Sequence, residues 1–358
     1  SRVHPHDGKG YPAKQVHGVP AGKGRNPNPK RMHARAGLAL EARAGRRGGK
    51  DCKMDETAMR GIPRSLNDEE GPCVPEGLPP VVDAHVHVFP DKLFDTVRAW
   101  FDAFAWDIRY RMPSRDVVSY LLERGVEHVV ALQYAHKAGI SRRLNEYMAE
   151  LCSEFHPRVT GLATVFPGED GCKDILREAF AMGLKGVKLH AHVQCFDVDG
   201  RPSREIYEVC ASENKPLVVH ASREPKSNAY LCDPYQLCSA TKVERVLRDF
   251  PGLRLCVPHL GVDEFEAYRR LLERFDNIWV DTAMVMAGYF PVEPPFTLCE
   301  LRRDRVMYGS DFPNIPYAWD RELSRIRLSG LPGDFLERLL HANAGEFFGI
   351  STGRAPRS

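Results

Sequence analysis

From residue 81 onward, segments with the pattern of a buried strand alternate with segments that have the periodicity of an amphipathic helix. Eight strand–helix units over roughly 270 residues have the size and order of an α/β fold, the (β/α)8 or TIM barrel. A doubly wound open sheet is the alternative, but it usually has a Gly-rich turn after its first strand, which is not seen after residue 88. The expected strands are 81–88, 126–133, 158–165, 185–190, 217–221, 253–258, 278–281 and 305–308. The expected helices are 91–104, 114–124, 141–155, 169–182, 203–214, 239–250, 263–275, a short one at 295–303, 319–328 and 332–341.

The chain before this region has a different composition. Residues 1–50 are rich in Gly, Pro, Lys and Arg and carry a net charge of +10, whereas the remaining residues carry −8. We therefore predict a disordered basic tail and Pro-rich linker at 1–79, the barrel at 80–350 and a C-terminal tail at 351–358. The tail fits a disordered appendage, or sequence upstream of a true start at Met54, better than a targeting peptide or a basic arm.

Composition excludes several classes of protein. No apolar run approaches the roughly 20 residues of a membrane span, and no N-terminal apolar segment resembles a signal peptide. The ten cysteines form no C-x-x-C pair, which favours a reduced protein. The acidic body argues against a nucleic-acid surface. We expect a cytoplasmic protein with no membrane or nucleic-acid partner, with organelle targeting by the tail left open.

The first predicted strand carries a charged or imidazole side chain at every second position. Because successive side chains of a strand point to opposite faces, Asp83, His85 and His87 are expected on one face. Two histidines at i and i+2 can chelate a cation, although a single His-x-His is more often a pair of semi-buried packing residues. The other face is expected to pack under helices and carries Val82, Ala84, Val86 and Val88.

Further polar side chains stand at the ends of other predicted strands. These residues are Lys188 and His190, His220, His259 and Asp311. A closed barrel brings the carboxyl ends of all its strands to one mouth. Several imidazoles, a lysine and a carboxylate are costly to bury together without a partner, and a divalent cation is an economical explanation.

Together these motifs resemble the amidohydrolase superfamily, most closely the branch called amidohydrolase family 2. The resemblance covers about 80–350 and rests on Asp-Ala-His-Val-His at 83–87, Gly-Val-Lys-Leu-His at 186–190, His220, Pro-His-Leu-Gly at 258–261, Gly-Ser-Asp-Phe-Pro at 309–313 and Ala342-Asn343-Ala344. It implies a metal-dependent barrel enzyme and says little about the substrate.

The resemblance also implies roles for individual residues. One divalent ion is expected, Zn²⁺ with Mn²⁺ or Fe²⁺ as alternatives, and its implied ligands are His85, His87, His220 and Asp311. A second metal bridged by a carboxylated Lys188 is the less favoured alternative. His259 would be a catalytic base, while Lys188 and His190 would face an anionic substrate. Asp83 is expected to be a structural hydrogen-bonding residue beneath the metal.

Three functions remain open. The first is hydrolysis of a small amide, ester or lactone, in which Asp311 accepts the proton of a metal-activated water and His259 and Lys188 stabilise the oxyanion. Arg223 could then bind a substrate carboxylate, or be a solvated loop arginine. The second is non-oxidative decarboxylation of an aromatic or unsaturated acid, and the third is a non-catalytic barrel. The expected partner is a small molecule, and a homodimer is allowed.

Overall fold

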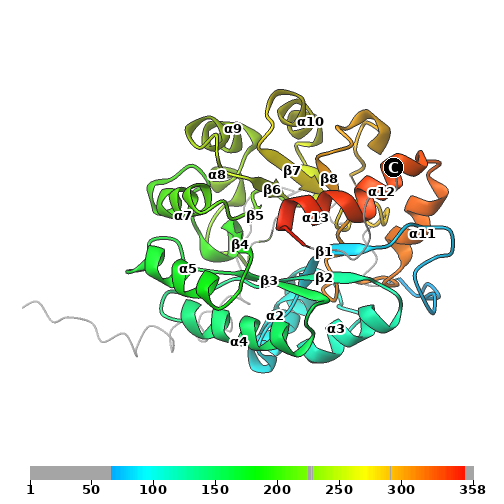
Figure 1. Cartoon of the computed structure of the whole chain (residues 1–358), viewed down its shortest axis with the longest axis horizontal. Coiled ribbons are helices and arrows are strands. Elements are labelled where there is room, and N and C mark those ends of the chain that lie inside the picture. Colours follow the sequence, from blue (N-terminus) through cyan, green and yellow to red (C-terminus); the bar gives the residue numbers. More distant parts are fainter. Residues whose placement is uncertain (1–65, 225–226, 228, 291, 351–358) are drawn as a thin grey trace, which may run out of the picture. The chain divides into compact units, whose positions relative to one another are not determined.

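The computed structural model describes residues 66–224, 227, 229–290 and 292–350. The predictions for 1–65 and 351–358 lie outside the described residues. The strands form one eight-stranded sheet in the order β1-β2-β3-β4-β5-β6-β7-β8, and every neighbouring pair in this series is parallel. Helices surround this sheet, as Figure 1 shows, and the predicted TIM barrel is confirmed.

The strands occupy the predicted segments; β7 has the predicted bounds, and the other seven are shorter than predicted. They are β1 Val82–His87, β2 His128–Leu132, β3 Val159–Ala163, β4 Gly186–His190, β5 Leu217–His220, β6 Leu255–Val257, β7 Ile278–Asp281 and β8 Val306–Met307. The longer helices are α2 Asp91–Phe104, α3 Ser114–Glu123, α4 Ser141–Glu154, α5 Cys172–Ala181, α7 Arg201–Ser212, α9 Ala240–Asp249, α10 Phe265–Arg274 and α11 Arg321–Leu328. None of the described helices is long and apolar enough to cross a membrane.

Short helical segments complete the chain, and several of them were not predicted. They are α6 Ala191–Gln194, α8 Pro234–Leu237, η3 His259–Gly261, η4 Leu298–Glu300, α12 Gly333–Glu337, η5 Arg338–Ala342 and α13 Asn343–Phe348. The expected helix at 295–303 is only the 3-10 turn η4. The expected helix at 332–341 is divided between α12 and the π-helical η5.

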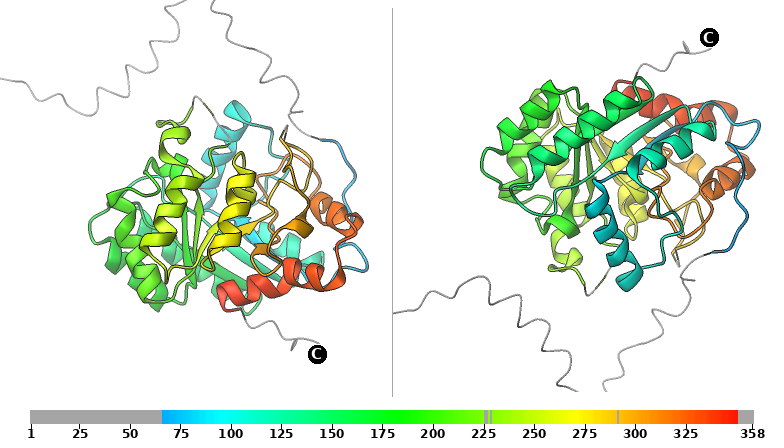
Figure 2. Two further views of the ribbon diagram at one scale, coloured as in Figure 1. Left: turned by 90° about the horizontal axis from the view of Figure 1, so that it is seen from above. Right: turned by 90° about the horizontal axis from the view of Figure 1, so that it is seen from below.

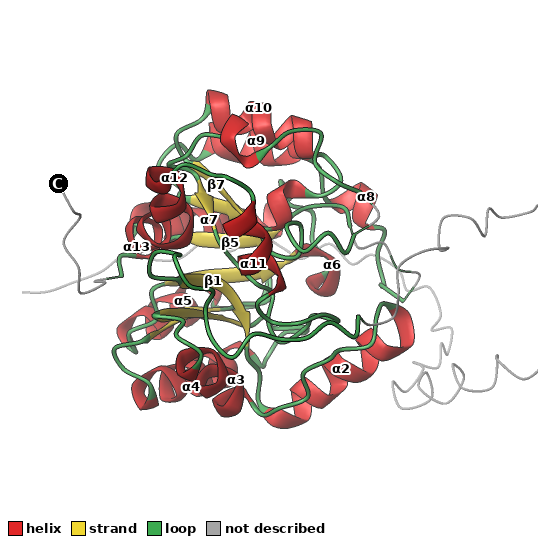
Figure 3. Ribbon diagram, turned by 90° about the vertical axis from the view of Figure 1, so that its right-hand side faces the viewer, coloured by secondary structure: helices red, strands yellow, loops and turns green. Residues whose placement is uncertain are grey.

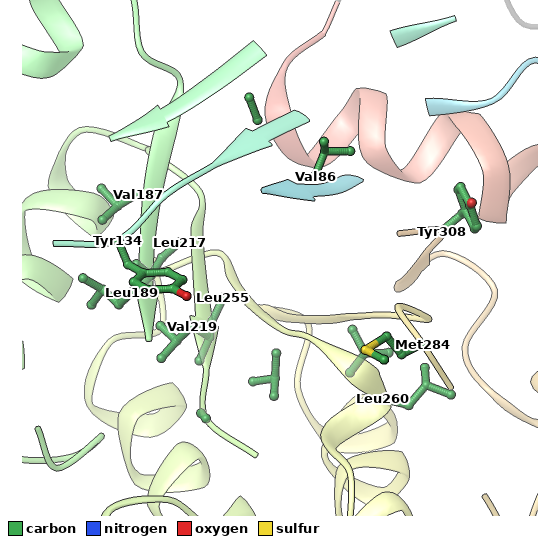
Figure 4. Packing of buried hydrophobic residues seen from close by; sticks show 14 of the residues in the cluster. Val86, Tyr134, Val187, Leu189, Leu217, Val219, Leu255, Leu260, Met284 and Tyr308 are labelled. Atoms are coloured by element: carbon green, nitrogen blue, oxygen red, sulfur yellow. The ribbon is translucent and has the colours of Figure 1, made fainter. Parts of the chain in front are cut away.

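The buried apolar side chains form two clusters, one inside the barrel and one between the strands and the helices. An inner cluster takes residues from β1, β2, β3, β5, β6 and β8, and Phe347 and Phe348 of α13 pack onto it. The outer cluster joins the strands to the helices, and Figure 4 labels Val187, Leu189 and Val219 among its members. In Figure 3, α12 and α13 lie at one end of the strands, while α6, α8 and the far end of α2 lie at the other.

Strict alternation along β1 was a wrong expectation. Val82 and Ala84 belong to the inner cluster, whereas Val86 and Val88 belong to the outer cluster. The cause is a register shift between Asp83 and Val86, where an extra residue interrupts the pairing with β2. Because of this bulge, the apolar side chains before His85 point into the barrel, whereas those after it point toward the helices.

The first and last strands are joined by backbone hydrogen bonds around this bulge. Ala84 N donates to Tyr308 O at 3.0 Å, and Asp311 N donates to His85 O at 2.9 Å. The segment that follows β8 therefore lies directly against the His-x-His segment of β1. Two candidate ligand groups that are far apart in sequence become neighbours in this way.

The Pro-rich approach to β1 lies against the barrel along its described part. Leu66 N donates to Pro316 O at 2.8 Å, and the Asp68 carboxylate pairs with Arg109 and Arg321. Residues 66–79 belong to the same compact unit as the barrel. The described part of the segment predicted as a linker is therefore tied to the barrel loops.

Candidate metal centre

Three side chains from β1 and the segment after β8 bring one ligand atom each to a single point. His85 Nε2 and His87 Nε2 are 3.2 Å apart, and Asp311 Oδ1 lies 3.3 Å from the first and 3.0 Å from the second. All three residues are buried. Two imidazole nitrogens and a carboxylate oxygen suit a divalent transition metal, and this is the group of described residues whose spacing could hold one.

Asp281 at the end of β7 supports this triad and was not singled out in the sequence. Its Oδ2 lies 2.8 Å from His85 Nδ1, while its Oδ1 accepts from the backbone N–H of His259 and of Ala283. Because the carboxylate accepts, His85 carries its proton on Nδ1 and presents a lone pair on Nε2 to the centre. Burial alone would raise the pKa of Asp281, but His85 and His259 hold it below its usual value.

The backbone at the centre is held in a sparsely populated conformation. His259 has φ 59° and Asp311 has φ 64°, values that cost energy for residues other than glycine. Asp83 stabilises the segment before Asp311, because its carboxylate accepts from the N–H and hydroxyl of Ser310 and from His85 N. Asp83 is therefore a structural hydrogen-bonding residue, as expected, and it joins β1 to the segment after β8.

Lys188 on β4 is fully buried beside the triad. Its Nζ lies 3.5 Å from His85 Nε2. Burial lowers the pKa of Lys188 to about 8, while Asp281 and Asp311 oppose the shift. A lysine in this position can present a cation to a bound anion.

His190 and His220 stand side by side at the ends of β4 and β5. They are paired in register, and their rings stack with centroids 4.2 Å apart. Burial holds the pKa of both imidazoles well below the usual value, so both are neutral at pH 7. His220 Nε2 lies 2.9 Å from the carbonyl oxygen of Glu224 and is not one of the atoms gathered with His85, His87 and Asp311.

His259 follows β6 and closes the other side of the centre. Its Nδ1 lies 2.8 Å from Ala283 O, and because a carbonyl can only accept, Nδ1 carries the proton. The free lone pair is then on Nε2. Its ring centroid lies 5.3 Å from that of His85 and 5.0 Å from that of His220.

Arg223 was predicted to be either a partner for a substrate carboxylate or a solvated loop residue, and in the structure it pairs with two carboxylates of the chain itself. Its Nε donates to Asp263 at 3.1 Å and lies 3.5 Å from Glu264. It is not among the residues that line the cavity at the centre. The arginine therefore ties the loop after β5 to the loop after β6.

The cavity above the centre is small and has aromatic walls. It measures about 40 Å³, and His87, Lys188, His259 and Asp311 are among the residues that line it. The aromatic side chains around it are Phe101, Trp106, Tyr134, Tyr230 and Phe290. Tyr134 lies just beyond β2, whereas the other four come from α2 and from loops, where strand-end positions carry no signal for them.

Comparison with known proteins agrees with this arrangement. A sequence profile of the amidohydrolase family matches residues 82–350. The sequence matches no curated protein. Among solved structures, 5-carboxyvanillate decarboxylase from Sphingomonas paucimobilis is 17% identical, with a TM-score of 0.55 over 76% of this chain and 99% of that one.

Two further structures share the fold. One is 5-carboxyvanillate decarboxylase from Novosphingobium aromaticivorans, complexed with manganese and 4-hydroxy-3-methoxy-5-nitrobenzoic acid. It is 16% identical, with a TM-score of 0.57 over 79% of this chain and all of that one. The other is a 2,6-dihydroxybenzoate decarboxylase complexed with 2,6-dihydroxybenzoate. It is 14% identical, with a TM-score of 0.53 over 76% of this chain and all of that one.

Proposed function

Because the chain belongs to amidohydrolase family 2, we propose that it is a metal-dependent lyase that removes the carboxyl group of a small aromatic or unsaturated acid. The observation that carries this proposal is the cavity above the centre, in which the buried cation Lys188 faces a candidate metal triad between aromatic walls. Such walls suit a flat, anionic substrate better than they suit the attacking water that hydrolysis needs. The decarboxylases with this fold bind aromatic acids, which supports the same choice.

The donor set fits a divalent ion. His85, His87 and Asp311 would hold it, with His220 as a further ligand if its ring turns away from Glu224 O. When bound, such an ion supplies a fixed positive charge that polarises and orients a carboxylate. Zn²⁺, Mn²⁺ and Fe²⁺ all suit these ligands.

The chain's own residues would perform the remaining steps. Lys188 binds an anionic oxygen of the substrate, and the aromatic walls hold the ring and exclude water. The bond between the ring carbon and the carboxylate breaks, CO₂ leaves, and the electron pair stays on the ring carbon. His259 Nε2, whose lone pair is free, or the Asp311 carboxylate would first take up a proton from solvent and then give it to that carbon, which returns the donor to its starting state.

Hydrolysis is the second candidate, and one observation favours it. The Asp311 carboxylate lies within 3.3 Å of both triad imidazoles, where it could accept a proton from an attacking water. Lys188, and His259 once its Nε2 has taken up a proton, would then stabilise the oxyanion.

Product analysis separates the two reactions. We expect the Mn²⁺-loaded full chain to release CO₂ from members of a panel of hydroxybenzoates and to place one deuterium in the product when the reaction runs in D₂O. Lys188→Met, which keeps the length of the side chain without its charge, should lower kcat/KM about a hundredfold. Incorporation of ¹⁸O from water into the product of an ester or lactone panel, without CO₂ release, would establish hydrolysis instead.

A further inference from the structure

A second cavity adjoins the one above the metal centre. It measures about 250 Å³, and α2, α6 and the loop after β5 contribute to its lining. Phe101, Tyr134, His190 and Tyr230 line both cavities. A molecule held at the centre could therefore extend past these four side chains into the larger space.

One wall of this second cavity is a continuous face of α2. Leu93, Val97 and Trp100 are spaced four and three residues apart, so they lie on the same side of the helix. In the views of Figure 2 and Figure 3, α2 projects away from the strand ends. The ring of Trp100 meets that of Tyr230 with centroids 4.9 Å apart, which brings α2 to the loop after β5.

The lining of this cavity is mostly apolar. Among the described residues that line it, none is Asp, Glu, Lys or Arg. His136, His190 and His192 are among its polar lining residues. An ionised group placed there would lose its hydration without gaining a partner of fixed opposite charge, whereas an alkyl or aryl group would be removed from water at no such cost. The space is also smaller than the pockets that enclose a whole drug-sized ligand, so it fits a part of one.

We propose that this second cavity is a subsite for an apolar substituent of the substrate, which makes the substrate an amphipathic acid. Its carboxylate end lies at the metal centre, a placement that rests on the proposed function, and its alkyl or alkyl-aryl end lies between α2 and Tyr230. The subsite itself depends only on the walls of the cavity.

Binding of a homologous series tests the subsite without any turnover. The probes are benzoate and 4-ethyl-, 4-butyl- and 4-hexylbenzoate, titrated calorimetrically into the Mn²⁺-loaded full chain. Each methylene that enters the cavity should tighten binding about fourfold (~0.8 kcal/mol) until the space is full. A series whose affinities stay within about threefold of benzoate would overturn the proposal.

A filled cavity should abolish this dependence on chain length. Val97→Trp places an indole inside the space, and the ratio of 4-butylbenzoate to benzoate affinity should fall to within about threefold. The matched control is Ala99→Trp, which adds the same indole at an exposed position of α2 outside both cavities and should keep the ratio. If Val97→Trp unfolds at a lower temperature, Val193→Phe fills the space from α6 and serves the same purpose.

The outcomes separate this inference from the proposed function. If no acid is ever decarboxylated but the affinities still rise with chain length, the subsite stands and the reaction is wrong. If CO₂ is released but Val97→Trp and Val193→Phe both keep the wild-type dependence on chain length, the subsite is wrong and the reaction stands.

Discussion

The two oxygens of Asp281 fix two different parts of the candidate centre. Oδ2 accepts from the ring of His85, and Oδ1 accepts from the backbone of His259, which begins the turn after β6. A neutral amide cannot replace this carboxylate, because one of its two ends is a donor. Whichever way an asparagine side chain turns, its NH₂ group would face either His85 Nδ1–H or the N–H groups of His259 and Ala283.

We therefore expect Asp281→Asn to weaken binding of Mn²⁺ or Zn²⁺ about 10- to 100-fold, since His85 would lose its fixed tautomer. Competition with a chromophoric chelator measures this affinity. Asp174→Asn, at an exposed carboxylate of α5, is the control and should bind metal like the wild type. Equal affinities for Asp281→Asn and the control would show that the carboxylate does not orient the ligand.

The identities of the central residues were visible in the sequence, while their orientations were not. His85, His87, Lys188, His190, His220, His259 and Asp311 could be found because each stands at or just beyond the end of a predicted strand. Asp281 ends a predicted strand as well, so the same signal could have found it. In contrast, the proton on His259 is fixed by the carbonyl of Ala283, and His220 Nε2 is directed at the carbonyl of Glu224. Such contacts depend on loop conformations that residue spacing does not encode.

At the level of elements, the segment after β8 must approach β1 closely. An added Cβ on Gly309 would lie 2.7 Å from the Cβ of His85 and 3.5 Å from the carboxyl carbon of Asp281. Residue 309 therefore has to be small for the segment after β8 to meet β1.

We predict that Gly309→Ala lowers the free energy of unfolding by about 1–3 kcal/mol and also weakens metal binding, because the methyl group displaces His85. Urea unfolding and the chelator competition measure the two effects. Gly252→Ala is the matched control, since nothing lies within 4 Å of an added Cβ there, and its stability should change by less than about 0.5 kcal/mol. An unchanged Gly309→Ala protein would mean that the strand ends tolerate a wider spacing.

The order of the elements could be predicted because each strand and most helices have their own local periodicity. The bulge in β1 could not, because it arises from the pairing of β1 with β2 and with the end of β8. The short helices α6 and α8 were missed for a similar reason: each is a single turn of four residues, too short for a periodic pattern. The second cavity is formed where α2 meets such loops, so residue spacing alone does not reveal it.

At the scale of the whole molecule, buried ionisable groups away from the centre link stability to pH. His128 begins β2, and its Nε2 lies 2.8 Å from the hydroxyl of Thr160. Burial, with smaller contributions from Arg158 and His341, lowers the pKa of His128 to about 4. The unfolded chain, in which histidine has a pKa near 6.5, takes up this proton first as the pH falls.

The contribution of His128 is therefore fully present above about pH 6.5 and is lost as the pH falls toward 4, because protons bind the unfolded state preferentially in that interval. We expect the wild type to lose about 2–3 kcal/mol more free energy of unfolding between pH 7 and pH 4 than His128→Gln, whose amide stays neutral. Urea unfolding at pH 7, 5.5 and 4 gives the comparison. His156→Gln, at an exposed histidine, should keep the wild-type dependence on pH. If His128→Gln and the wild type lost stability in parallel, the acid sensitivity of the barrel would have to come from other groups.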